Sequence, residues 1–546
     1  MSDHKQVLVD LILNQKESRG RGYVKLNSQN LEDSGLKDWV TDHIDSWLTA
    51  KPHFTSTADW LDGGLATIAG AMDVCSRILA RGRNQEEEKC RRKVEEAERR
   101  LEMHPISERV WATERESRLA EWEKVQLEKH TWWEETLKVK GIIVHDRMTR
   151  DTFRKLLLST FFHQVVQLYH PFDPEAPEAT SQDDMLEYAK LYYSDILTAR
   201  RIHDTSDTYL SLERDMWEDT MVRLGEADIL ALDRPVTVEE LKRTLKVMAP
   251  IKCPGRDGLT VEFYRACWEA MGPTLVEIYN EVLLEGKLGE LMTYGVISVM
   301  FKKGDKANIR NYRPIFVLNV SYYKLQAKTL ALRLGRILPK LAEKDQGAFV
   351  QGRSIFVNIL TAIESIELIQ VENLDLIVML LDMEKDYEKV GWSFVLTTQR
   401  KMGFGVGFCK WVVAMYTVTT SLVQVNGHLS KQFQLSRSLR QGCSLTPLLF
   451  VLQLEVPLNC IRSHSRIRGL RVSGNQECRA KALTDNLFLI SANTADSLGA
   501  LEAVLLDYSL LSEAQVNWGK STFLIPEGYE LQVEWGMKRV DPETGE

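Results

Sequence analysis

"LDLIVMLLDMEKDYEKVGW", residues 374–392, contains an unbroken apolar run from Leu376 to Leu381. Such a run is typical of a strand buried at the centre of a sheet, and Asp382 follows it directly. A carboxylate at the end of a buried strand stands on a rigid element, as a metal ligand must. Because Asp also ends many strands simply as a turn starter, the stretch alone predicts a core strand and one candidate ligand.

A second stretch, "ALTDNLFLIS" at 482–491, places Thr-Asp-Asn inside an otherwise apolar segment. We expect two short strands joined at Thr484, Asp485 and Asn486, which presents Asp485 at a hairpin tip. Two carboxylates from different strands that converge on Mg²⁺ are the minimum for two-metal phosphoryl transfer. Taken alone, a plain Asp-Asn turn is the simpler interpretation of this stretch.

A glycine with polar neighbours marks a third stretch, "SRSLRQGCSLTPLLF" at 436–450. Gly442 lets the backbone approach a ligand closely, while the side chains before it donate hydrogen bonds. Those donors are Arg437, Arg440 and Gln441. The combination favours contact with a base pair or a triphosphate over a place in the core.

Positive charge is concentrated in one segment of a chain whose net charge is −8. Three tyrosines interleave with the cations and offer stacking surfaces beside phosphate contacts. A solvated helix face would usually mix both signs, so we interpret the segment as a nucleic-acid surface. Against Asp305 alone, it holds Lys302, Lys303, Lys306, Arg310, Arg313, Lys324, Lys328, Arg333, Arg336 and Lys340, with Tyr312, Tyr322 and Tyr323 between them.

Length, cysteine spacing and apolar segments argue against a zinc protein, a secreted protein and a membrane protein. The 546 residues allow several domains, and the eight cysteines show no spacing typical of a zinc site. Neither the first twenty residues nor the longest apolar segment, 445–458, has the length and composition of a signal peptide or a membrane span. We therefore expect an intracellular protein with no membrane partner.

Residues 81–140 are rich in helix formers and charge, and Trp111, Trp122 and Trp133 recur every eleven residues. This spacing predicts a long helix or a helical hairpin that breaks at Pro105. A charged surface helix with an aromatic packing stripe is the simpler interpretation, and an arm that binds a protein partner is the alternative.

A second helix is predicted to begin at Thr237, because Glu240 stands three residues later at the capping-box spacing. We place a domain boundary near residue 235, and from there to about 525 strand-like and helical segments alternate.

In order along the chain, these motifs resemble the reverse transcriptase domain of non-LTR (LINE-type) retrotransposons. The resemblance rests on "KCPGRDGLTVEFY" (252–264), "NYRPIFVLN" (311–319), "QGAFVQGRSI" (346–355), "LDMEKDYEKVGW" (381–392), "RQGCSLTPLLF" (440–450) and "VNWGKS" (516–521). It implies an α+β fold, a right-hand polymerase palm and fingers, preceded by an α-rich N-terminal region. The implied divisions are a post-endonuclease-like segment (1–80), a mainly helical linker region (81–234), fingers and palm (235–525) and a truncated C-terminal tail (526–546), without an endonuclease or a full thumb.

The resemblance also implies a role for single residues. Asp382 and Asp485 would bind the metal, Mg²⁺ with Mn²⁺ as a substitute, and Lys520 would help to protonate the leaving pyrophosphate. The nucleotide would be held by Arg313, Lys303, Tyr387, Gln441 and Gly442, with Tyr387 next to the sugar 2′ position. The implied partners are an RNA template, a DNA primer and deoxynucleotides.

Departures from the family pattern concentrate at these motifs. The family's Phe/Tyr-Ala-Asp-Asp is Leu-Thr-Asp-Asn at 483–486, an expected alanine is Asp386, and an expected serine is Phe316. Asn486 keeps the shape of aspartate but loses its charge, and Mg²⁺ affinity falls with the charge of the ligands. Two hypotheses follow: a reverse transcriptase with impaired activity, or a non-catalytic nucleic-acid-binding remnant.

Overall fold

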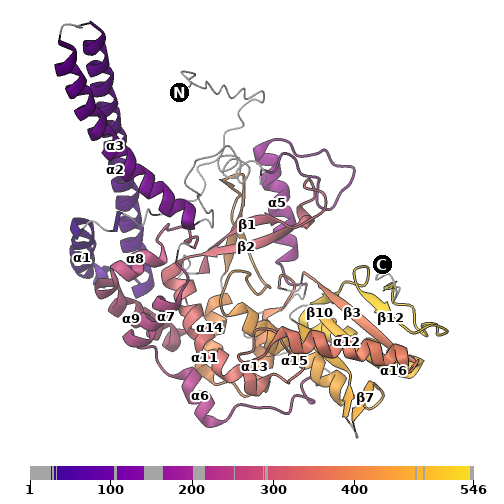
Figure 1. Cartoon of the computed structure of the whole chain (residues 1–546). Coiled ribbons are helices and arrows are strands. Elements are labelled where there is room, and N and C mark those ends of the chain that lie inside the picture. The colour runs from indigo at the N-terminus through magenta and orange to yellow at the C-terminus, as the bar shows by residue number, and fades with distance from the viewer. Residues whose placement is uncertain are drawn as a thin grey trace.

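The computed structural model describes residues 26, 30–31, 34–103, 107–139, 164–200, 215–250, 252–286, 288, 293–385, 387–416, 419–473, 476–483 and 486–540. These residues form a body of mixed helix and sheet, from which a helical arm projects (Figure 1).

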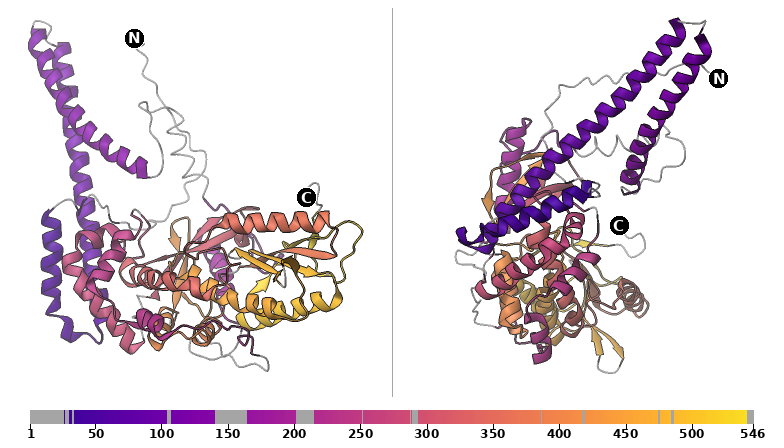
Figure 2. Two further views of the ribbon diagram at one scale, coloured as in Figure 1. Left: turned by 60° about the horizontal axis from the view of Figure 1, so that its bottom comes forward. Right: turned by 90° about the vertical axis from the view of Figure 1, so that its left-hand side faces the viewer.

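The arm is a pair of long antiparallel helices, α2 (Thr57–Met103) and α3 (Glu108–Val139), which extends away from the body (Figure 2). Its base includes α1 (Ser34–Leu48) and the 3-10 turn Lys51–His53. Ion pairs join the two long helices, between Lys93 and Glu121 and between Arg115 and Glu98, each at 3.1 Å. The predicted helical hairpin is present, and its expected break, Pro105, lies outside the described residues.

The boundary that we predicted at residue 80 falls inside α2, because helix-forming residues continue without interruption across it. By length and composition alone, α2 also contains a window that could cross a membrane. Of that window 24% is buried, and Trp60, Leu65 and Ile68 of the same helix belong to the main core.

Helices α5 to α9, α11 and α14 make up much of the body, and one of their N-termini was predicted. Helix α7 begins after Thr237, whose hydroxyl accepts a hydrogen bond from the Glu240 amide at 3.2 Å. The second half of the expected capping box does not form, because the Glu240 carboxylate pairs with Arg333 at 2.6 Å. The bounds are α5 (Gln182–Ile196), α6 (Glu226–Asp233), α7 (Val238–Val247), α8 (Val261–Ala266), α9 (Trp268–Glu285), α11 (Leu325–Leu341) and α14 (Val406–Tyr416).

A five-stranded sheet has the order β2-β1-β4-β5, with β6 also paired to β4. Strand β1 is antiparallel to β2 and parallel to β4, so segments more than a hundred residues apart meet in it. The 3-10 turn Ile309–Asn311 leads directly into β2, and a π-helical turn (Val320–Lys324) follows it. The strands are β1 (Gly295–Phe301), β2 (Tyr312–Leu318), β4 (Thr420–Val425), β5 (His428–Leu429) and β6 (Phe433–Gln434).

A six-stranded sheet has the order β13-β12-β3-β10-β9, with β11 also paired to β3. Strand β3 (Leu376–Glu384) is central, as the apolar run predicted, and β9 and β10 form the predicted hairpin. The remaining strands are β9 (Ala480–Leu483), β10 (Asn486–Ala492), β11 (Gln515–Val516), β12 (Thr522–Leu524) and β13 (Lys538–Arg539). The segment that we predicted to be a tail thus returns to the sheet through β13, which pairs with β12.

Helices cover both faces of the six-stranded sheet (Figure 2). One face of β3, including Ile377, Met379 and Leu381, belongs to the main core, which α13 (Trp392–Lys401), α15 (Thr446–Ser463) and α16 (Ala495–Ser512) help to form. On the other face, Val378 packs with Ile369 of helix α12 (Ile355–Val371). A two-stranded ribbon, β7 (Leu470–Ser473) and β8 (Gln476–Cys478), adjoins this second cluster. Side chains of β3 beyond Val378 on the α12 face, Leu380 and Asp382, remain accessible.

A buried carboxylate lies in the loop before α8. Asp257 accepts a hydrogen bond from the Leu259 amide at 3.2 Å through Oδ1, and its buried Oδ2 has no hydrogen-bond partner among the described residues. Burial raises the pKa of this carboxyl to about 7, although Lys324 opposes the shift. The protonated form is favoured because water no longer solvates the charge.

We predict that Asp257 makes folding pH-dependent. The pKa is raised in the folded state, so the folded chain binds more protons than the unfolded chain between about pH 4 and 7. Stability should therefore fall as the pH rises through this window, by an amount on the order of 3 kcal/mol. Chemical denaturation of the natural chain and Asp257→Asn at pH 4.5 and 7.5 should show a smaller decline in the variant. An equal decline in both proteins would contradict the prediction.

Candidate functional site

Asp382 lies where β3 leaves the core, and its backbone is anchored on both sides. Its amide donates to Ser521 Oγ at 3.1 Å, and its carbonyl accepts from the Asn517 amide at 2.8 Å. The side chain lines a cavity of about 840 Å³ between the two sheets. Its place at the end of a rigid core strand is the one that the sequence predicted.

The residue across the strand pair from Asp382 is Asn486. The two are direct partners in the antiparallel register of β3 and β10, and directly paired residues place their side chains on the same face of a sheet. Asn486 therefore stands beside Asp382 on the face that borders the cavity. Asp485, the predicted second carboxylate, and Thr484 connect β9 to β10 and lie outside the described residues.

Lys520 belongs to the loop that anchors Asp382. Its amide donates to the Asn517 carbonyl at 3.0 Å, and Ser521 Oγ donates to the same carbonyl at 2.8 Å. Both Asn517 and Lys520 line the cavity. The motif near residue 520 and the motif at residue 382 are thus held together by hydrogen bonds to the Asp382 backbone, one from the Asn517 amide and one to Ser521 Oγ.

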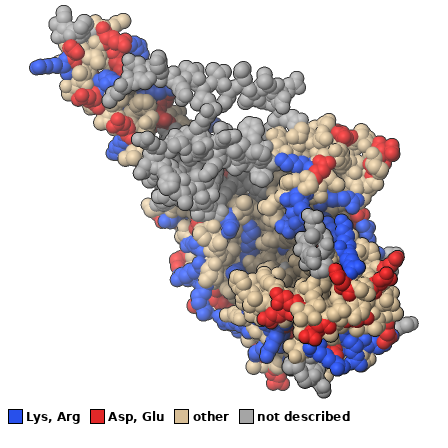
Figure 3. Space-filling model, turned by 45° about the vertical axis from the view of Figure 1, so that its right-hand side comes forward, with Lys and Arg blue, Asp and Glu red and all other residues tan. Residues whose placement is uncertain are grey.

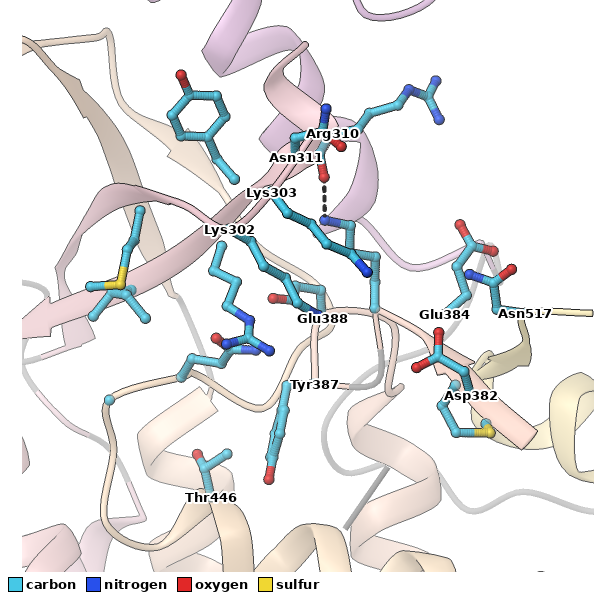
Figure 4. A pocket seen from close by; sticks show the side chains of 18 of the residues that line it. Lys302, Lys303, Arg310, Asn311, Asp382, Glu384, Tyr387, Glu388, Thr446 and Asn517 are labelled. Carbon is cyan, nitrogen blue, oxygen red and sulfur yellow. Dashed lines mark hydrogen bonds between the residues drawn. The ribbon is translucent and has the colours of Figure 1, made fainter. Parts of the chain in front are cut away.

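Cations form the opposite wall. Lys302 and Lys303 follow β1, Arg313 is the second residue of β2, and all three line the cavity. Figure 4 shows Lys302 and Lys303 in this wall. On the outside of the molecule, Lys and Arg side chains border a hollow in the body (Figure 3). Six cationic residues line the cavity against three acidic ones, so the site is electropositive and suits a polyanion.

The floor is built from Tyr387, Gln441 and Gly442, which all line the same cavity. The Tyr387 ring packs on Phe450 at a centroid distance of 4.8 Å, and the Gln441 carbonyl accepts from the Phe316 amide at 2.8 Å. Gly442 has φ of +107°, and a Cβ there would lie 2.6 Å from the Phe316 carbonyl oxygen. Glycine is thus required by the close approach of this loop to β2.

Two of the arginines predicted to serve this site are buried instead. Arg437 pairs with Glu513 at 2.5 Å and donates to the Ile196 carbonyl, with 2% of its surface exposed. Arg440 is fully buried, and its guanidinium lies 5.1 Å from the Tyr323 ring centroid and 5.9 Å from that of Phe316. Neither arginine can reach a ligand in the cavity, because each side chain turns into the core.

The basic segment at 297–340 is likewise divided between two roles. Four of its residues, Lys302, Lys303, Arg310 and Arg313, line the cavity. Others serve the fold: Lys324 donates to the Cys253 carbonyl at 2.5 Å, Arg333 is buried against Glu240, and Lys340 pairs with Asp228 at 2.7 Å. The prediction of one continuous nucleic-acid surface was too broad, since charge alone does not show which way a side chain points.

Three residues of the site were not predicted. Lys385 and Glu384 line the cavity beside Asp382, and Glu388 lies there with 2% of its surface exposed. Burial lowers the pKa of Lys385, and Lys520 and Lys302 add to this effect. Burial raises the pKa of the Glu388 carboxyl, while Lys385 opposes the shift. All three stand within the stretch at 374–392, but only the tertiary structure shows that they face the cavity.

The donor set fits a hard cation. Asp382 and Glu384 stand two positions apart on β3 and so lie on the same face of the strand. Carboxylate oxygens are the ligands that Mg²⁺ prefers, and the Glu384 carboxylate also pairs with Lys389 at 2.8 Å. Within the described ranges, no group of three or more His, Cys, Asp or Glu side chains gathers at metal-binding distance. The described carboxylates alone therefore do not make a complete ligand set.

We predict that Arg440→Met stabilises the protein. The three guanidinium nitrogens of Arg440 are buried and have no hydrogen-bond partner among the described residues, and the two rings compensate the charge only in part. Replacing a poorly compensated buried charge with an apolar side chain of similar volume raises stability by about 1–4 kcal/mol.

The matched control is Arg437→Met, which leaves the buried Glu513 without its ion pair and should cost about 3–5 kcal/mol. Chemical denaturation of both variants gives the comparison. Destabilisation of similar size in both would show that Arg440 has a strong partner.

Comparison with known proteins shows similarity to one family and to one relative. Residues 301–538 match the family described as reverse transcriptase (RNA-dependent DNA polymerase). The chain is also similar to a Xenopus laevis protein described as "Transposon TX1 uncharacterized 149 kDa protein", with 27% identity over 514 residues. This alignment covers 92% of the chain but 37% of that protein, so the chain spans well under half of its relative. The resemblance inferred from the motifs is confirmed.

Proposed function

Since residues 301–538 carry the reverse transcriptase domain of a transposon-related protein, we propose that this chain is the polymerase segment of a LINE-type element. Its reaction is RNA-directed DNA synthesis, and Asn486 severely reduces the rate. The six-stranded sheet acts as the palm and the five-stranded sheet as the fingers. The partners are an RNA template, a DNA primer and deoxynucleotides, inside the cell.

The observation that carries this proposal is that residues from distant motifs meet in one cavity. Seven of the eight residues to which the family resemblance gives a role line one electropositive cavity, although the eight are spread over more than 200 residues. The eighth, Asp485, is outside the described residues. An accidental set of surface residues would not converge in this way. The seven are Lys303, Arg313, Asp382, Tyr387, Gln441, Gly442 and Lys520.

In the proposed reaction the primer 3′-hydroxyl attacks the α-phosphorus of a deoxynucleotide and loses its proton to solvent, while the bond from the α-phosphorus to pyrophosphate breaks and pyrophosphate leaves. Arg313 and Lys303 bind the triphosphate, and Lys520 donates a proton to the departing pyrophosphate. Tyr387 contacts the sugar, and the Gln441–Gly442 loop supports the nucleotide from below. Asp382 and Asp485 would hold Mg²⁺, which supplies charge stabilisation for the transferred phosphoryl group.

Asn486 affects this chemistry through its position. It stands directly across from Asp382, where a second aspartate of the hairpin is expected from the family pattern. The amide contributes no negative charge to a site whose lining is already rich in cations. Disturbing residues that support a metal site costs about 10–100-fold in affinity or activity, and a residue this close should cost at least that much.

The second candidate function is binding without catalysis, and Asn486 is the observation that favours it. The cationic wall persists whether or not metal is held, so affinity for template RNA or nucleotides can outlast polymerisation.

We predict that Asn486→Asp raises primer extension at least about 10–100-fold, because it restores a carboxylate across from Asp382. Extension of a DNA primer on an RNA template, in Mg²⁺ and again in Mn²⁺, provides the measurement. Asp382→Ala in the same background is the control and should abolish extension.

Two results would change the conclusion. Extension by the natural chain that Asp382→Ala eliminates, with no gain in Asn486→Asp, would show that one hairpin carboxylate suffices. No extension by any variant, with RNA still bound, would establish the binding function instead.

A further inference from the structure

Lys385 occupies a turn that aims its side chain across the cavity. It directly follows β3, three residues after Asp382, and its φ is +50°. A non-glycine residue in this left-handed conformation is energetically unfavourable. The unusual backbone bends the chain away from the strand direction and sends a long cationic side chain toward the five-stranded sheet.

The Lys385 ammonium joins three parts of the molecule. Its Nζ donates to the Arg310 carbonyl at 2.9 Å, a contact between residues 75 positions apart, drawn as a dashed line in Figure 4. The same Nζ lies 5.9 Å from the Tyr192 ring centroid on α5. One side chain from the end of β3 thus contacts both the segment before β2 and helix α5.

The Arg310 carbonyl connects the Lys385 side chain to the strand that carries Arg313. Arg310 belongs to the 3-10 turn Ile309–Asn311, and Arg313 follows two residues after that turn. The Arg310 side chain holds the turn as well, because its guanidinium donates to the Pro171 carbonyl at 2.8 Å and lies over the Tyr192 ring. The turn is therefore fixed both by its own contacts with helix α5 and the loop before it and by Lys385.

We propose that Lys385 is a positioning residue that sets the separation between Asp382 on the six-stranded sheet and Arg313 on the five-stranded sheet. A nucleotide that bridges the cavity must meet both residues, so its affinity depends on this separation. A lysine suits the role because it spans the gap and keeps further N–H donors after bonding one carbonyl. The inference rests on the proposed function, since it assumes that a nucleotide bridges these two residues.

The first test measures steady-state primer extension in the Asn486→Asp background. Lys385→Met should raise the KM for the deoxynucleotide about 10-fold or more, since small misplacements of binding groups cost large factors, and it should change kcat much less. Lys385→Arg, which can still donate to the carbonyl, should recover most of the loss. An unchanged KM in Lys385→Met would overturn the proposal.

The matched control is Lys410→Met. Lys410 also donates to a distant backbone carbonyl, that of Leu284 at 3.2 Å, but it joins helices outside the cavity. This variant should lose one long-range lysine–carbonyl bond without altering the KM.

A second test does not depend on activity. Hydrogen exchange of the amides in residues 309–318 should be faster in Lys385→Met than in the natural chain, with no nucleotide present, and unchanged in Lys410→Met. A lysine that merely touched the triphosphate would not alter exchange in the free protein. Unchanged exchange would therefore refute the positioning role even if no variant extends a primer, whereas faster exchange without extension would refute only the polymerase.

Discussion

Strand β3 can be buried only if its polar backbone is paired along both edges, because an unpaired amide or carbonyl inside a protein is costly. Strands β10 and β12 supply that pairing, and β11 continues it at the end of the strand. Each of these neighbouring strands places a polar residue near the end of β3. Strand β10 places Asn486 across from Asp382, and the loop between β11 and β12 carries Lys520. The arrangement of the site is thus a consequence of completing hydrogen bonds around one apolar strand.

The charges of the protein fall into two groups that differ in solvation. Buried arginines such as Arg333 and Arg437 hold elements together through ion pairs with Glu240 and Glu513. Cations that line the cavity remain partly hydrated and are repelled by one another, so a polyanionic ligand would relieve that repulsion. Arg440 fits neither group, since aromatic rings take the place of an acidic partner. Phe316, one of those rings, stands where the family pattern has serine.

Much of the fold was accessible from local patterns. The apolar run 376–381 predicted the central strand, and the Thr-Asp-Asn interruption predicted the β9–β10 hairpin. Helix-forming residues predicted the arm, although its first helix, α2, begins at Thr57, well before the predicted boundary at residue 80. Local patterns could not show which strands pair, because β1 pairs with β4, which lies more than a hundred residues later in the chain. No periodicity encodes which distant strands meet.

For the candidate site, the sequence by itself determined the chemical types: a carboxylate after a core strand, a glycine beside Gln441, and a lysine near residue 520. It also determined the loss of charge at Asn486, since that is a property of the residue alone. Only the tertiary structure decided which cations face the cavity, and it turned Arg437 and Arg440 inward while it directed Lys385 across to Arg310. The physical reason is that orientation depends on burial and on pairing with residues far away in the chain. Side-chain type is local, but the surroundings that decide its role are assembled only when the two sheets come together.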